Sequence, residues 1–245
     1  MKVVAVVQAR VGSTRLPGKV LKDISGKPML WHVLNRLRLS NRLNDIVLAI
    51  PDSKRNDQLE DFSKGLNLHH FRGSEDDVLS RYYGAATKFG ADVIVRLTSD
   101  CPLIDPRVTD KVIEEHLNSD ADYTSSSIKR TFPRGLDTEV FNFATLERAH
   151  REAKQDYERE HVTPYIYQHP NLFQLKSVEA TGKLRRPDLR LTVDTEEDLK
   201  LIREIFKRLQ RNGQVFYIED VINLLDKHPE LVAINAHVRQ KELGE

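Results

Sequence analysis

The amino-acid sequence predicts an α/β fold, in which a mostly parallel, Rossmann-like sheet carries helices on both faces. The first observation is that apolar runs of strand length alternate with amphipathic stretches of helical spacing through the first half of the chain. This alternation is typical of βαβ units, whose parallel strands are joined by helical crossovers. The second observation is the length of 245 residues, which suits one large α/β domain. We therefore expect a single domain over residues 1–245.

The expected elements follow one another in a regular order. Continuous apolar runs indicate strands, at residues 3–7, 45–50, 68–71, 93–97, 123–127 and 189–193. Apolar residues at helical spacing indicate helices, at residues 29–37, 59–62, 78–86, 108–117, 199–209 and 218–225. In such a sheet, the loops that leave the carboxyl ends of the strands lie along one edge, where ligands bind. The residues that follow these strands are therefore the first candidates for a functional site.

Residues 129–188 interrupt this order. They contain prolines at positions 133, 164, 170 and 187, together with several Arg and Tyr side chains. The regular alternation of strands and helices is lost over this stretch. We expect it to be an irregular α+β insertion, which covers a bound substrate, contacts a second subunit, or does both.

The composition excludes several classes of protein. The chain has 38 Lys and Arg against 37 Asp and Glu, whereas proteins that bind nucleic acid or anionic membranes usually carry a basic excess. No stretch approaches the roughly 18 apolar residues of a membrane span. The one cysteine, Cys101, has no partner for a disulfide within the chain. We expect a cytoplasmic protein that has neither nucleic acid nor a membrane as its partner.

The loop after the first predicted strand concentrates positive charge. It reads Gln-Ala-Arg-Val-Gly-Ser-Thr-Arg-Leu-Pro-Gly-Lys over residues 8–19. Its glycines let backbone N–H groups approach an anion, and its hydroxyl and cationic side chains add further donors. The spacing matches neither a Walker A loop nor a G-x-G-x-x-G dinucleotide loop. We interpret the loop as a polyphosphate site of another kind, in preference to a solvated basic turn.

Two aspartates follow predicted strands. Asp100 comes after residues 93–97, and Asp194 comes directly after residues 189–193. Nucleotidyl transfer usually needs Mg²⁺, which is held by one or two carboxylates together with phosphate oxygens and water. Each aspartate also has a simpler interpretation, as a turn residue or a helix cap. Asp198 is interpreted as a first-turn residue that favours the helix dipole.

Residues 8–21, followed by Ile-Ser-Gly-Lys-Pro-Met-Leu at 24–30, resemble the signature of the cytidylyltransferase family that makes CMP-activated sugar acids. This family includes the CMP-Kdo and CMP-acylneuraminate synthetases, and Gln-Ala-Arg is most similar to its spore coat polysaccharide biosynthesis protein F branch. The resemblance implies a GT-A-like nucleotidyltransferase fold. It implies transfer of CMP from CTP to a sugar, an acidic one for surface polysaccharide, with release of pyrophosphate. It also implies a homodimer, and we place the contact in residues 129–188.

The resemblance further assigns roles to individual residues. Arg10, Lys19 and Asp100 are implied to be catalytic, and Asp100 and Asp194 to hold Mg²⁺. The residues implied to bind the nucleotide are Ala9, Arg10, Gly12, Ser13, Thr14, Arg15, Lys19, Arg72, Ser74, Arg81 and Ser99. For two of them a structural alternative stays open, in which Ser74 forms a helix capping box with Asp77 and Arg81 only decorates the surface of that helix.

Two polar segments, residues 133–140 and 157–165, also resemble the spore coat F branch. They are implied to bind the sugar acceptor through Arg134, Asp137, Glu139, Arg159, Glu160 and His161. A charged surface at a subunit contact would explain the same residues. The chain departs from the CMP-Kdo pattern at Gln8, where Pro is expected, and at Ser99, where Gly is expected. The resemblance therefore leaves the class of acceptor open.

Three rival functions remain at this stage. A glycosyltransferase that consumes a nucleotide sugar commonly carries an Asp-x-Asp metal motif after a strand, whereas residues 120–122 of this chain precede one. A guanylyl- or uridylyltransferase could share the scaffold, because the base is read largely through backbone geometry. A non-catalytic nucleotide-binding protein would bind CTP without turnover. Release of pyrophosphate is the observation that separates the first and third of these from the expected reaction.

Overall fold

A seven-stranded sheet forms the centre of the molecule, with the strand order β5-β4-β1-β6-β8-β7-β9. The computed structural model describes residues 1–210 and 214–241. The strands are β1 (Val3–Gln8), β4 (Asp45–Pro51), β5 (His69–Gly73), β6 (Val93–Thr98), β7 (Tyr123–Ser125), β8 (Glu139–Asn142) and β9 (Leu175–Ser177). Strand β8 runs antiparallel to its neighbours, and the other neighbouring pairs are parallel. The predicted α/β fold with a mostly parallel sheet is thus confirmed. A short hairpin of β2 (Asp23–Ile24) and β3 (Lys27–Pro28) lies apart from it.

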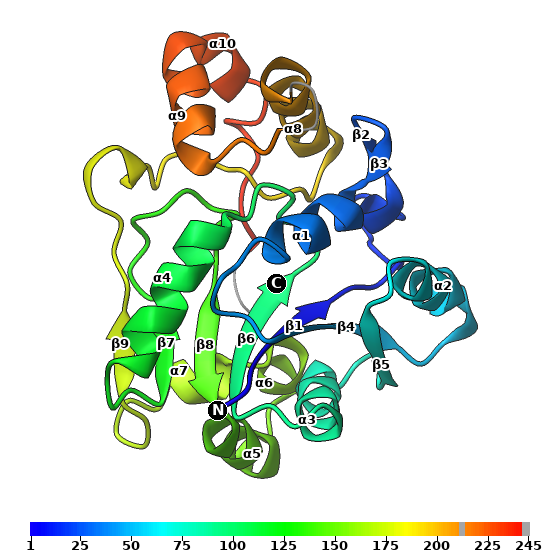
Figure 1. Cartoon of the computed structure of the whole chain (residues 1–245), viewed down its shortest axis with the longest axis vertical. Helices are drawn as coiled ribbons and strands as arrows, with labels where there is room; N and C mark the ends of the chain where they lie inside the picture. Colours follow the sequence, from blue (N-terminus) through cyan, green and yellow to red (C-terminus); the bar gives the residue numbers. More distant parts are fainter. Residues whose placement is uncertain (211–213, 242–245) are drawn as a thin grey trace.

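Helices cover both faces of the sheet (Figure 1). They are α1 (Met29–Leu37), α2 (Asp57–Gly65), α3 (Val78–Lys88), α4 (Pro106–Leu117), α5 (Phe143–Glu152), α6 (Asp156–His161), α7 (Pro164–Tyr167), α8 (Glu196–Leu209), α9 (Ile218–Lys227) and α10 (Pro229–Val232). Alternate residues of β1 point into two separate cores, because successive side chains of a strand face opposite sides. Val3, Ala5 and Val7 share a core with α1, α2, α4 and α8, whereas Val4 and Val6 share one with α3 and α5. Among the described residues, no helix is both long enough and apolar enough to cross a membrane.

The position of β1 in the sheet determines where the loops meet. Strand β1 lies between β4 and β6, and the chain adds β4 and β5 on one side before it returns to add β6 on the other. Residues Gln8 and Thr98 are register partners at the carboxyl ends of β1 and β6. The loops that follow these two strands therefore start side by side, at the point where the strand order reverses. Open α/β sheets bind ligands at this point.

The prediction of a strand over residues 189–193 is wrong. This segment makes one isolated parallel bridge, between Arg134 and Arg190, and does not join the sheet. It lies beyond the carboxyl end of β6, where loop groups satisfy its backbone: Val193 N–H donates to the Asp100 carbonyl at 2.8 Å, and Leu191 N–H to the Arg134 carbonyl at 2.7 Å. The apolar run is thus buried against loops, and it still carries Asp194 to the side of Asp100.

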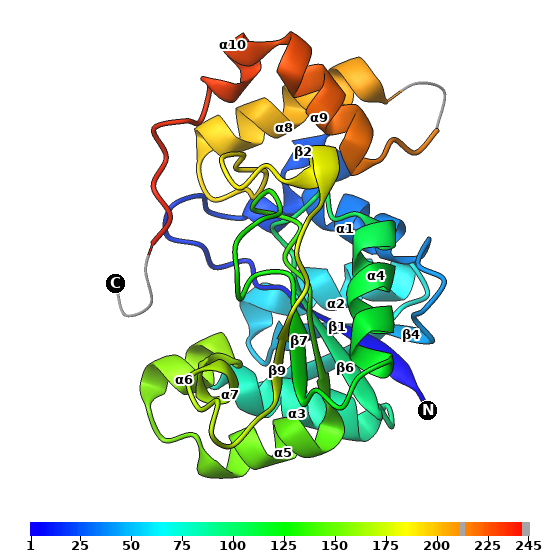
Figure 2. The same cartoon turned by 90° about the vertical axis from the view of Figure 1, so that its left-hand side faces the viewer.

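Residues 129–188 contribute more regular structure than their sequence indicates. They supply β8, which lies between β6 and β7 inside the sheet, and β9 at its edge. They also form α5, α6 and α7, which lie together at one end of the molecule (Figure 2). The stretch is therefore integrated into the main sheet. Its expected part in covering the acceptor or contacting a second subunit stays a prediction.

Candidate active site

A cleft of about 1130 Å³ opens at the carboxyl ends of β1 and β6. Its walls come from the loop after β1, from β6 and β8, and from the segment around α6. Most of the predicted site residues line it, namely Ala9, Arg10, Gly12, Ser13, Thr14, Arg15, Lys19, Arg81, Ser99, Asp100, Arg134, Asp137, Glu139, Glu160, His161 and Asp194. The fold thus gathers residues from six separate parts of the sequence around one space.

The loop after β1 is held in shape by its own hydrogen bonds and by one buried neighbour. Gly18 N–H donates to the Val11 carbonyl at 3.1 Å, and the positive φ of 66° at Gly18 suits glycine. Val11 N–H donates to the Oδ1 atom of Asn56, a fully buried residue, at 3.0 Å. Gly12 packs against Arg55, whose guanidinium would lie 3.2 Å from a Cβ atom there. These contacts position the loop so that Lys19, at its end, reaches the two aspartates.

Lys19 connects Asp100 and Asp194. Its Nζ atom lies 2.8 Å from Asp100 Oδ2 and 2.8 Å from Asp194 Oδ1, and it donates to the Val193 carbonyl at 2.9 Å. Burial opposes the ionisation of Asp100, but the Lys19 ammonium outweighs this effect and lowers the pKa of Asp100 to about 2. Burial also opposes the charge of Lys19, and the two carboxylates nevertheless raise its pKa. Asp100 and Lys19 are therefore both charged at neutral pH.

The two aspartates suit a hard divalent cation that also takes ligands from a substrate. No cluster of three or more His, Cys, Asp or Glu side chains that could enclose a metal is found in residues 1–210 and 214–241. Mg²⁺ does not need such a cage, since it commonly binds one or two carboxylates and completes its shell with phosphate oxygens and water. Asp100 Oδ2 and Asp194 Oδ1 already share one cation, the Lys19 ammonium. The donor set thus fits Mg²⁺ bound together with a phosphorylated ligand.

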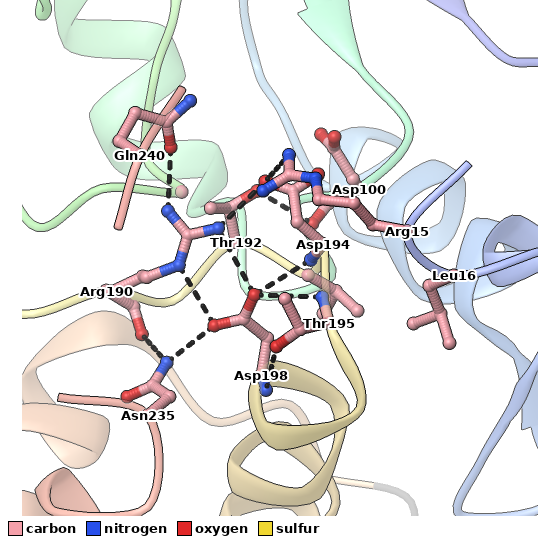
Figure 3. A network of polar contacts seen from close by, with 12 residues as sticks. Arg15, Leu16, Asp100, Arg190, Thr192, Asp194, Thr195, Asp198, Asn235 and Gln240 are labelled. Atoms are coloured by element: carbon pink, nitrogen blue, oxygen red, sulfur yellow. Dashed lines mark hydrogen bonds and ion pairs between the residues drawn. The ribbon is translucent and has the colours of Figure 1, made fainter. Parts of the chain in front are cut away.

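Asp194 is fixed by two residues whose roles the sequence did not reveal (Figure 3). Asp198 closes a capping box with Thr195 at the start of α8, and it also accepts a hydrogen bond from Asp194 N–H at 2.9 Å. Arg190 contacts Asp194 Oδ2 at 2.8 Å and Asp198 Oδ1 at 2.9 Å. Asp198 therefore does more than favour the helix dipole. An arginine within the apolar run Leu-Arg-Leu-Thr-Val was the available signal for Arg190.

Both carboxylate oxygen atoms of Glu139 contact other side chains of the protein. Its Oε1 atom accepts hydrogen bonds from the Tyr123 hydroxyl at 2.5 Å and from the Thr163 hydroxyl at 2.9 Å, and its Oε2 atom pairs with Arg96. Among the described residues, the buried Nε atom of Arg96 has no hydrogen-bond partner. Arg96 also lines the cleft and is not among the residues predicted from the sequence. Glu139 thus acts on the cleft through the orientation of Arg96.

Three predicted site residues lie outside the cleft lining and bind to neighbouring protein groups. Arg72 pairs with Asp57 and Glu60 at 2.7 Å. Ser74 Oγ accepts a hydrogen bond from Asp77 N–H, next to the start of α3. Arg159 donates to Asp77 Oδ2 at 2.6 Å through Nη2. Their direct contact with nucleotide or acceptor stays a prediction, and the structural alternative for Ser74 agrees with its contact.

Arg81 and His161 lie on the cleft side of this region. Arg81 is 2% exposed and donates to the Ser74 carbonyl, so it connects that turn to the cleft. Burial, together with the charges of Arg96 and Arg10, lowers the pKa of His161. Burial is the main cause of this shift, and the neighbouring carboxylate of Glu160 opposes it. This part of the cleft therefore presents both cationic and anionic side chains.

Comparison with known proteins gives a consistent result. A family model described as cytidylyltransferase matches residues 4–224. The spore coat polysaccharide biosynthesis protein SpsF of Bacillus subtilis is 36% identical over 230 residues, which cover 92% of this chain and 94% of that protein. A 3-deoxy-manno-octulosonate cytidylyltransferase of Geobacter sulfurreducens is 34% identical over 116 residues, 46% of this chain and 44% of that protein. The solved structure of a cytidylyltransferase from Leptospira borgpetersenii matches with a TM-score of 0.89 and 31% identity, over 99% of both chains.

Proposed function

The chain belongs to the cytidylyltransferase family and is a nucleotidyltransferase, and from this premise we propose that it transfers CMP from CTP to a hydroxyl group of an acidic sugar. The resemblance of residues 8–30 to this family is thereby confirmed. The observation that supports the proposal best is the position of Lys19, at the end of the loop after β1, between Asp100 and Asp194. This arrangement combines donors for a triphosphate with two carboxylates for its counter-ion.

In the proposed reaction, the acceptor hydroxyl oxygen forms a bond to the α-phosphorus of CTP. The bond from the α-phosphorus to the oxygen that bridges to the β-phosphate breaks, the hydroxyl proton is released, and pyrophosphate leaves. Arg10, Arg15 and Lys19, with the backbone N–H groups of the loop, stabilise the negative charge that develops on the pyrophosphate. Asp100 and Asp194 would hold Mg²⁺, which when bound neutralises phosphate charge and helps to align the reacting groups.

The acidic nature of the acceptor is proposed from the side chains that line the rest of the cleft. They include Arg96, Arg130, Arg134 and His161, together with the carboxylates of Asp137 and Glu160. Guanidinium groups recognise carboxylates well, and carboxylates accept hydrogen bonds from sugar hydroxyls. The buried Nε atom of Arg96 adds a donor that has no partner among the described residues. This mixture suits a hydroxylated sugar that carries one negative group.

The wider setting is part of the same proposal. The name of the Bacillus subtilis relative supports a role in surface polysaccharide biosynthesis, in the cytoplasm, where CTP is available. We expect a homodimer whose contact includes residues 129–188, since β9 is an edge strand that pairs on one side only among the described residues. Light scattering on the purified chain measures the mass in solution, and a monomer at micromolar concentration would contradict this part.

The test is a pyrophosphate-release assay that crosses the four nucleoside triphosphates with a panel of sugar acids. We expect release with CTP and one class of acceptor. Release of a nucleoside diphosphate from a nucleotide sugar would support the rival glycosyltransferase reaction.

Asp100→Asn is expected to lower turnover at least about 100-fold while the fold is kept, because a charge at the reacting phosphate is lost. Circular dichroism monitors the fold of the variant. Near-normal turnover in a folded Asp100→Asn protein would contradict the metal assignment.

A further inference from the structure

Asp194 is held both at its backbone and at its carboxylate by one pair of residues (Figure 3). Its N–H donates to Asp198 Oδ2 at 2.9 Å, and its Oδ2 atom accepts from Arg190 Nη2 at 2.8 Å. Arg190 also donates to Asp198, through Nε at 2.9 Å and through Nη2 at 3.2 Å. The pair is well shielded, since the side chain of Asp198 is 0% exposed and that of Arg190 10%. Asp194 therefore has little freedom to rotate while this pair is intact.

The two oxygen atoms of Asp194 have different neighbours. Oδ1 lies 2.8 Å from Lys19 Nζ, which is also 2.8 Å from Asp100 Oδ2, so these two oxygens are within twice that distance of each other. Oδ2 faces Arg190 at 2.8 Å and Arg15 at 3.1 Å. Lys19 and Arg15 belong to the loop after β1, and the proposed function assigns both to the phosphates of CTP. When Lys19 and Arg15 contact the phosphates of a bound nucleotide, Arg190 is then the cation that remains in contact with Asp194.

Arg190 is in turn anchored by the C-terminal segment, residues 233–241, which leaves α10 and runs back toward the cleft (Figure 2). Asn235 is 3% exposed. Its side-chain amide donates to Asp198 Oδ1 at 2.8 Å and to the Arg190 carbonyl at 3.0 Å. Gln240 Oε1 accepts a hydrogen bond from Arg190 Nη1 at 2.7 Å. Gln240 thus contacts the guanidinium group of Arg190 directly, and Asn235 holds the Arg190 backbone and the Asp198 carboxylate.

We propose that Arg190 is a positioning residue that turns Asp194 so that Oδ1 faces Asp100, and that Asn235 holds Arg190 and Asp198 in place for this purpose. The proposal rests on the proposed function, because it assumes that Asp100 and Asp194 share a divalent cation. A partner that orients a metal-binding carboxylate commonly changes metal affinity by 10- to 100-fold when it is lost. The C-terminal segment, whose Gln240 and Lys241 also line the cleft, therefore belongs to the active site.

The test measures binding of Mn²⁺ alone to the full chain, by electron paramagnetic resonance of the unbound ion. Arg190→Lys keeps the positive charge but lacks the planar fork that contacts two carboxylates, and we expect it to weaken Mn²⁺ binding about tenfold or more. In Asn235→Leu, the new side chain has a shape similar to that of asparagine, and the charge does not change. We expect the Mn²⁺ affinity to fall by about 3- to 10-fold, which corresponds to the loss of a hydrogen bond. Asn223→Leu, on the exposed side of α9, is the matched control and should bind as the wild type does.

Each possible result has a defined meaning. Mn²⁺ affinity that is unchanged in folded Arg190→Lys and Asn235→Leu proteins, with only the melting temperature lowered, would show a merely structural role and overturn the proposal. If the Asp194→Asn variant bound Mn²⁺ as tightly as the wild type does, that result would also overturn the proposal. Pyrophosphate release from CTP, measured on the same preparations, tests the proposed function separately. A wild type that binds Mn²⁺ through Asp194 but releases no pyrophosphate would refute that function and leave the positioning role standing.

Discussion

Glu139 and Arg96 form an ion pair in the wall of the cleft, with side chains that are 9% and 15% exposed. The two hydroxyl groups that donate to Glu139 complete its hydrogen bonding, so the carboxylate is satisfied although it is buried. Burial of such a pair adds little net stability, but loss of one partner leaves the other charge buried without compensation. The pair therefore serves mainly to hold the Arg96 guanidinium in one orientation.

Glu139→Gln is expected to lower the free energy of unfolding by about 3 kcal/mol, because Arg96 would then lie buried without its counter-charge. Urea denaturation followed by circular dichroism measures this difference. Glu179→Gln is the comparison variant, since Glu179 pairs with Lys129 on the surface and such pairs contribute about 0–1 kcal/mol. Equal effects of the two substitutions would contradict the importance given to the Arg96 orientation.

At the scale of elements, Gly135 determines how closely the segment before β8 approaches the segment that carries Asp194. It has a φ of 106°, and a Cβ atom there would lie 2.7 Å from the Leu191 backbone carbon and 2.8 Å from the Thr192 nitrogen. The adjacent residue Arg134 exchanges backbone hydrogen bonds with Leu189 and Leu191. Only a residue without a side chain permits both the conformation and this contact.

Gly135→Ala is expected to destabilise the protein by about 2–3 kcal/mol or more, through backbone strain and the clash with residues 191–192. Gly65→Ala is the control, because a Cβ atom there meets nothing within 4 Å and alanine stabilises a helix. Thermal unfolding of both variants is the measurement. A melting temperature of Gly135→Ala at or above that of the control would show that the two segments can separate at little cost.

The elements also show how far the sequence alone could lead. Strands β1, β4 and β6 were predictable because continuous apolar runs of this length suit buried parallel strands. The same pattern was misleading at residues 189–193, since burial against loops selects apolar residues just as burial in a sheet does. The loop after β1 and the two aspartates were predictable from residue type and from their place after apolar runs. Arg96, Arg190 and Asn235 were not, because their partners lie far away in the sequence.

At the scale of the whole molecule, buried titratable groups make stability depend on pH in two ranges. Burial lowers the pKa of His32 and of His116, each about 3% exposed, below the usual 6.5. A histidine kept neutral in the folded state binds fewer protons there than in the unfolded state, so stability falls as the pH drops below about 6.5. Asp100 has a pKa near 2, and Arg190 helps to lower that of Asp198 despite burial.

We expect the free energy of unfolding to decrease first from about pH 6.5 downward and again from about pH 4 toward pH 2. In the second range, Asp100 and Asp198 bind protons in the unfolded state but stay ionised in the folded state. The stability that their ion pairs provide above pH 4 is therefore lost as the pH falls. Urea titrations at a series of pH values measure both steps. His116→Gln should reduce the first step and leave the second, and a profile that stays flat between pH 7 and pH 5 would contradict the account of the histidines.

The connection from Lys19 to the two aspartates has a further consequence for folding. It joins residues that are 81 and 175 positions apart, whereas the hydrogen bond from Leu16 to Ser13 within the loop spans 3 positions. Contacts between distant residues form late, because the entropy of closing long stretches of chain must be lost first. The turn at Ser13 and Leu16 can therefore form early, while the contact of Lys19 with both carboxylates exists only when the fold is nearly complete. If the proposed function holds, uptake of a divalent ion during refolding would mark the last stage of the process, and chains halted earlier would bind neither metal nor nucleotide.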